Sequence, residues 1–178
     1  MKPPPANARV LGEGRYLRLV DEAGWEYVTR HRVSGIVVLV AITPAREVIL
    51  VEQYRRAVHS QVVELPAGLV GDLDDQADES LATAAHRELI EETGYSAREM
   101  VEIAHGPVAV GVSDEIITFF EARGLERVGE GGGDDTENIT VRVVPLAGLT
   151  AFLAERRAAG LLVDPKIFAG LHLAGVAP

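Results

Sequence analysis

The chain of 178 residues carries a formal net charge of −10 and contains no cysteine. Its length suits one domain with one sizeable core, and its acidic balance argues against nucleic acid as a partner, which would require clustered Lys and Arg. Without cysteine the sequence cannot form disulfides, thiolate zinc sites or thiol nucleophiles, and we expect a reducing cytoplasm to be its compartment.

Residues 1–9 include three consecutive prolines and are expected to form a flexible leader, followed by a single domain over residues 10–178. The leader lacks the apolar stretch of a secretory signal. The longest apolar run, Ile36 to Ile42, is far too short to span a bilayer, so we expect no membrane insertion.

Strand and helix patterns alternate along the chain. Strands are predicted over 16–20 and 25–30 as a hairpin, then over 35–42, 47–54 and 62–65, and later over 100–105, 115–122 and 139–144. A central helix is predicted to begin near Asp78 or Ser80 and to end at Gly94, and helical periodicity returns over 146–159 and 165–173. A Gly- and Asp-rich loop over 129–135 is expected to be mobile. Mixed strands with a central helix and closing helices predict an α/β sandwich.

The most informative stretch is the acidic segment that closes the central helix. Glu88, Glu91 and Glu92 stand at i, i+3 and i+4, so on a helix they project from one face. Like charges at this spacing destabilise a helix, whereas a divalent cation among them would relieve the repulsion. Carboxylate oxygens suit Mg²⁺, or Mn²⁺. The alternative is a solvated acidic face, which the triplet by itself favours.

The surroundings of the triplet favour the metal. They resemble the Nudix box, in which a glycine, five residues, a glutamate and seven residues precede Arg-Glu-apolar-x-Glu-Glu-x-Gly-apolar. Glu79, seven intervening residues and the run from Arg87 to Tyr95 fit this pattern without a gap. The box glycine is assigned to Gly68, which precedes Glu79 by ten intervening residues rather than five and indicates a loop insertion around residues 71–75.

The Nudix resemblance implies a fold and a metal site. The implied fold is an α/β/α sandwich with a mixed sheet, here with antiparallel strands at the N-terminus. The implied ligands of Mg²⁺ are the side chains of Glu88, Glu91 and Glu92 and the backbone carbonyl of Ala67. In the same resemblance Arg87 and Glu79 form an internal pair that fixes the box loop against the helix, and Arg87 and Glu91 are also one helical turn apart.

A closer resemblance to ADP-ribose pyrophosphatases supplies further candidates. Residues 111–119 are similar to the loop and strand after the box in that subfamily, which makes Glu115 the candidate base that activates water, with Glu91 as a further catalytic carboxylate. Glu137 is the second candidate for the base. Arg55 and Arg56 are candidates to bind phosphate, and Trp25 to stack on a base, although core packing is an equal alternative for an aromatic residue there.

The resemblance implies Mg²⁺-dependent hydrolysis of the pyrophosphate bond in a nucleoside diphosphate sugar. ADP-ribose is the expected substrate, other nucleoside diphosphate sugars stay open, and the products would be a nucleoside monophosphate and a sugar phosphate. The alternative from another class is a Nudix-fold nucleotide sensor that binds without turnover. The N-terminal strands and apolar closing helices resemble those that build homodimers in this subfamily, so a homodimer is expected.

Overall fold

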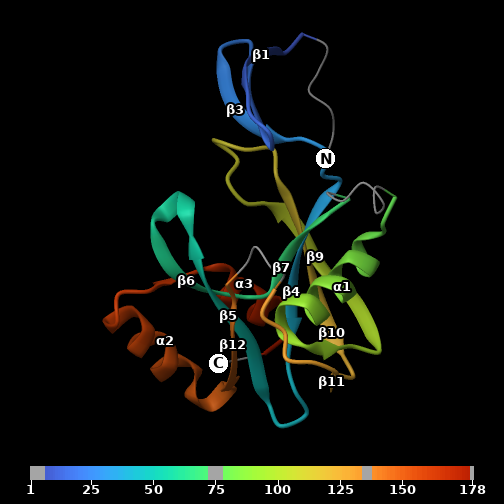
Figure 1. Cartoon of the computed structure of the whole chain (residues 1–178), viewed down its shortest axis with the longest axis vertical. Coiled ribbons are helices and arrows are strands. Elements are labelled where there is room, and N and C mark those ends of the chain that lie inside the picture. The colour runs from blue at the N-terminus through green and yellow to red at the C-terminus, as the bar shows by residue number, and fades with distance from the viewer. Residues whose placement is uncertain (1–6, 72–77, 134–137, 177–178) are drawn as a thin grey trace.

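The computed structural model describes residues 7–71, 78–133 and 138–176 (Figure 1). The described strands form a three-stranded antiparallel sheet at the N-terminus, two four-stranded sheets and a two-stranded ladder. The N-terminal sheet has the order β1-β2-β3, with β1 Arg9–Glu13, β2 Leu17–Glu22 and β3 Trp25–Arg30. It projects from the rest of the molecule, at the top of Figure 1.

The two larger sheets are both mixed. One has the order β7-β4-β10-β9, with β7 Ala67–Val70, β4 Gly35–Ala41, β10 Ile116–Arg123 and β9 Glu99–Pro107. The other has the order β12-β5-β6-β13, with β12 Thr140–Pro145, β5 Glu47–Arg55, β6 Ser60–Glu64 and β13 Leu162–Val163. A two-stranded ladder joins β8 Tyr95–Ser96 to β11 Glu126–Arg127.

Helices cover both sides of these sheets. The α-helices are α1 Leu81–Thr93, α2 Leu149–Ala158 and α3 Lys166–Leu173, with short 3-10 turns at Arg56–Val58 (η1) and Leu146–Gly148 (η2). Strand β4 lies between them, and its side chains alternate as a strand requires. Val38 and Val40 pack in a cluster with α2 and α3, whereas Val37 and Leu39 pack in a second cluster with α1.

The N-terminal sheet is attached to the body of the molecule through β3. Val28 pairs with Ser113 in a parallel bridge, and its N–H donates to the Val112 carbonyl at 2.8 Å. Thr29 Oγ1 donates to an Asp114 carboxylate oxygen at 2.8 Å. The loop before β10 thus holds the N-terminal sheet in place.

The predicted α/β sandwich, with its mixed sheet and N-terminal antiparallel strands, is confirmed. The longer strands and all three helices lie where the patterns predicted them, within a few residues at their ends. Strands β1, β7, β8, β11 and β13 were not predicted, and β1 begins at Arg9, inside the predicted leader. Of the predicted mobile loop over 129–135, residues 134 and 135 lie outside the described residues. Within the described ranges, no helix combines the length and apolar character needed to cross a membrane.

Candidate active site

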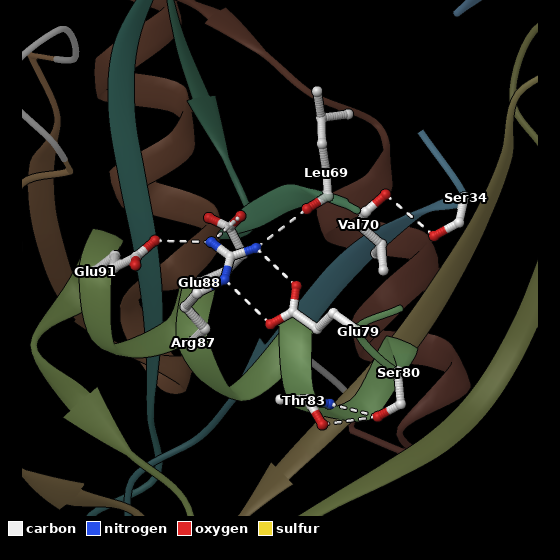
Figure 2. A network of polar contacts seen from close by, with 9 residues as sticks. All are labelled: Ser34, Leu69, Val70, Glu79, Ser80, Thr83, Arg87, Glu88 and Glu91. Atoms are coloured by element: carbon white, nitrogen blue, oxygen red, sulfur yellow. Dashed lines mark hydrogen bonds and ion pairs between the residues drawn. The ribbon is translucent and has the colours of Figure 1, made fainter. Parts of the chain in front are cut away.

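The central helix α1 carries the acidic triplet and is defined at both ends by its sequence. Ser80 is the N-cap, and its Oγ accepts the Thr83 N–H at 3.1 Å (Figure 2), as a serine before a helix favours. Gly94 ends the helix with φ +73°, and its N–H donates to the Ile90 carbonyl at 2.9 Å. A left-handed residue at this position favours glycine, so the predicted helix end is confirmed.

Arg87 joins the helix to the segments on either side of the box loop. Its Nε and Nη2 donate to the two carboxylate oxygens of Glu79, each at 3.2 Å. Nη2 also donates to the Leu69 carbonyl of β7 at 3.2 Å (Figure 2). The predicted internal pair of Arg87 and Glu79 is thereby confirmed, and one guanidinium ties β7 to the residue before the helix N-cap.

The remaining terminal nitrogen of Arg87 contacts two members of the triplet. Nη1 donates to Glu88 Oε1 at 2.8 Å and to Glu91 Oε2 at 2.9 Å. Burial disfavours the charged guanidinium, but the hydrogen bond to Glu79 and the charge and hydrogen bonds of Glu88 and Glu91 outweigh it, so the pKa of Arg87 is raised. Arg87 is therefore a permanent cation among three carboxylates.

The other two triplet members lie against the start of β7. Glu92 is 2% exposed, and its Oε2 accepts the Ala67 N–H at 3.0 Å. Glu88 lies against the backbone of Gly68, where an added Cβ would stand 1.9 Å from Glu88 Cδ. Only glycine leaves room for this side chain, which supports the assignment of Gly68 as the box glycine. The inserted loop itself falls largely on residues 72–77, outside the described residues.

The oxygen atoms around Ala67 are of the kind that a hard divalent cation prefers as ligands. The glutamates Glu88, Glu91 and Glu92 and the Ala67 carbonyl offer only oxygen, which Mg²⁺ prefers. Among the described residues, however, no three acidic or histidine side chains are gathered into a ready metal-binding group. Glu91 instead points to Arg87 (Figure 2), so binding of a cation by all three glutamates requires their side chains to turn.

Glu115, the first candidate for the base, is bound by a residue of the N-terminal sheet. Arg30 Nε donates to Glu115 Oε1 at 2.6 Å. Glu115 lies three residues before Thr118, which pairs with Val37, and Val37 pairs with Gly68. Strand geometry then separates the backbones of Glu115 and Gly68 by roughly 14 Å. The catalytic role of Glu115 stays a prediction.

Glu137, the second candidate for the base, lies outside the described residues. The predicted phosphate-binding arginines lie at the end of β5. Arg55 Nε donates to Glu64 Oε2 at 2.6 Å, and Arg56 begins the turn η1.

Trp25 begins β3 and is 62% exposed, so core packing of its ring, the alternative considered from sequence, does not occur within the described chain. Strand β3, which begins at Trp25, belongs to the projecting sheet and lies apart from α1 (Figure 1).

Three charged residues near these candidates were given no role by sequence reasoning. Glu64, the partner of Arg55, is buried, and burial raises its pKa while Arg55 offsets this only in part. Asp164 and Lys166, at the start of α3, form an ion pair whose charges also act on Glu64. For Glu64, the sequence showed only a glutamate directly before Leu65-Pro66, which is typical of the end of a strand.

Comparison with known proteins agrees with this geometry. The profile of the NUDIX domain matches residues 31–163, about three quarters of the chain. The chain therefore belongs to the NUDIX family, and the acidic helix α1 with β7 is its box.

Three proteins with similar sequences carry different functional names. The chain is 32% identical over 131 residues to a methanol dehydrogenase activator of Bacillus methanolicus, covering 73% of this chain and 67% of the relative. It is 33% identical over 151 residues to an ADP-ribose pyrophosphatase of Mycobacterium tuberculosis, covering 83% and 69%. It is 33% identical over 124 residues to a GDP-mannose pyrophosphatase of Salmonella arizonae, covering 65% and 62%.

A solved structure shares the fold. The crystal structure of an ADP compounds hydrolase matches with a TM-score of 0.69 at 21% identity, covering 95% of this chain and 90% of the other. At that identity the match speaks for the fold alone.

Proposed function

We propose that the protein is a Mg²⁺-dependent hydrolase of the pyrophosphate bond in nucleoside diphosphate sugars, with ADP-ribose as the preferred substrate. Mn²⁺ is an alternative cation. The observation that carries the proposal is the meeting of α1 and β7, where Glu92 accepts the Ala67 N–H and Glu88 lies against Gly68. Carboxylate and carbonyl oxygens are the ligands that a phosphate-bound Mg²⁺ prefers, and a turn of the glutamate side chains would bring them onto one cation at this meeting point.

Glu88, Glu91, Glu92 and the Ala67 carbonyl would hold the cation. When bound, Mg²⁺ stabilises negative charge on the phosphate oxygens and activates water. In the reaction, a water oxygen forms a bond to one phosphorus while the bond from that phosphorus to the bridging oxygen breaks. The bridging oxygen leaves with the second phosphate, and the proton of the water passes to a carboxylate, for which Glu115 is our candidate.

Substrate binding is assigned to the arginines after β5 and to the N-terminal sheet. Glu64 fixes Arg55 through Nε, which leaves the rest of a partly exposed guanidinium to bind phosphate. Arg56 adds a second positive charge. Trp25 offers an exposed ring for stacking on the base, and it would reach the substrate of a second copy of the chain more readily than its own, because its sheet projects from the body (Figure 1).

The substrate class rests on the relatives. The ADP-ribose pyrophosphatase aligns with more of this chain than the GDP-mannose pyrophosphatase does, at the same identity. The test is to incubate the purified protein and Mg²⁺ with ADP-ribose, GDP-mannose and other nucleoside diphosphate sugars, and to separate the products. We expect AMP and ribose phosphate to be released fastest. Binding of ADP-ribose without any product would instead support the nucleotide sensor.

We further propose that the protein is a homodimer built through the N-terminal sheet. Leu17 and Leu19 alternate along β2 and are both exposed on one face, whereas Val20 on the other face is fully buried. Val10 and Leu11 of β1 and Trp25 of β3 are exposed on the same sheet. A concentration of exposed apolar side chains on a projecting sheet is typical of a protein–protein interface.

A further inference from the structure

Arg87 divides its guanidinium between two groups of acceptors. One side, Nε and Nη2, holds Glu79 and the Leu69 carbonyl. The other, Nη1, bonds at once to Glu88 and to Glu91, at 2.8 and 2.9 Å (Figure 2). The first set ties Glu79 and β7 to α1, while the second reaches carboxylates that the proposed function assigns to a metal ion.

We propose that Arg87 is a built-in competitor of the divalent cation for Glu88 and Glu91 and thereby sets how tightly helix α1 binds metal. This inference rests on the proposed function. A positive charge between two carboxylates lowers their mutual repulsion, as a metal ion would. A cation that takes Glu88 Oε1 or Glu91 Oε2 therefore breaks a charge-assisted hydrogen bond to Nη1.

The contacts of Arg87 allow this exchange without loss of the fold. Glu79 is 7% exposed at its side chain and binds through two nitrogens, so it anchors the guanidinium on its own. Glu91 is about half exposed and is free to turn into solvent or toward a cation. The exchange then moves only carboxylates, while Arg87 stays on Glu79 and Leu69.

The proposal makes two predictions of opposite sign. In Glu79→Gln, Arg87 no longer shares its charge with Glu79, so it holds Glu88 and Glu91 more firmly and metal binding weakens. In the double variant Glu79→Gln with Arg87→Gln the competitor is removed with no change in net charge, and metal binding tightens. We expect about a tenfold change in each direction, the equivalent of one charge-assisted hydrogen bond.

The experiment is a titration of the full-length, substrate-free protein with Mn²⁺, followed by the electron paramagnetic resonance of unbound Mn²⁺. Glu99→Gln is the matched control for Glu79→Gln, because it makes the same change in charge at a glutamate that is 64% exposed. Arg87→Lys guards against misfolding of the double variant. A lysine can satisfy buried Glu79 but cannot also span Glu88 and Glu91, so it should tighten Mn²⁺ binding too.

If Arg87 only organises the site, the double variant and Arg87→Lys will bind Mn²⁺ more weakly than the wild type, and the inference is overturned. The proposed function would survive that result if the wild type still hydrolyses ADP-ribose. If the wild type itself binds no Mn²⁺, both the inference and the metal-dependent function are overturned.

Discussion

The pair of Arg87 and Glu79 should be among the costliest polar contacts of the fold to remove. The side chain of Glu79 is 7% exposed and that of Arg87 17%, and two hydrogen bonds of 3.2 Å join them. Removal of one partner from a buried ion pair costs about 3–5 kcal/mol. In Glu79→Gln an amide oxygen still accepts one bond, and Arg87 keeps Glu88, Glu91 and the Leu69 carbonyl. We therefore expect the free energy of unfolding to fall by about 2 kcal/mol.

The measurement is urea unfolding of the wild type and Glu79→Gln in EDTA, with Glu99→Gln as the control. Glu99 meets Arg123 at 3.9 Å on the surface, and such a pair contributes about 0–1 kcal/mol. The control should therefore stay close to the wild type. If Glu79→Gln lies within about 0.5 kcal/mol of the control, the pair does not stabilise the fold, and the structural role assigned to Arg87 is wrong.

Three further predictions concern the base, the assembly and a buried carboxylate. Glu115→Gln should lower turnover by roughly a hundredfold or more with KM and thermal stability nearly unchanged; if Glu137→Gln shows that loss instead, the base lies beyond the Gly-rich loop. Leu19→Glu should convert a dimer to a monomer in multi-angle light scattering at micromolar protein, and a wild type that is already monomeric contradicts the assembly. Burial raises the pKa of Glu64 above its ordinary 4.5. The free energy of unfolding of the wild type, relative to that of Glu64→Gln, should therefore be greatest below pH 4.5 and fall as the pH rises through the raised pKa. A difference between the denaturation midpoints of the two proteins that stays constant across several pH values would refute this.

Hydrophobic periodicity and the residues at its two ends were sufficient to predict helix α1. Ser80 and Gly94 mark its ends because a cap hydroxyl and a left-handed glycine act within the helix itself. Strand β7 was missed because the predicted strand over 62–65 ends at Pro66, yet the segment after this proline pairs with β4. Its strand conformation comes from a partner some 30 residues earlier, and no local pattern records that.

The contacts of the candidate site also divide into those set by nearby residues and those set by the tertiary fold. The contact of Arg87 with Glu91 follows from helical spacing, and its contact with Glu79 was implied by the Nudix resemblance; both are present. The bond of Arg30 to Glu115 joins residues 85 positions apart, and it depends on how the N-terminal sheet meets the loop before β10. Glu64 was missed for a similar reason, since its burial and its partner Arg55 follow from strand pairing rather than from composition.

The most direct test of the account is the rate of ADP-ribose hydrolysis by the wild type and Glu92→Gln, with Mg²⁺ at saturation and with EDTA. Glu92 is buried against Ala67, and an amide is a poorer ligand than a carboxylate for a hard cation. We predict that EDTA abolishes wild-type turnover and that Glu92→Gln loses at least about a hundredfold in kcat while it unfolds at the same urea concentration. Wild-type turnover by a folded Glu92→Gln at saturating Mg²⁺ would show that α1 does not carry the metal chemistry.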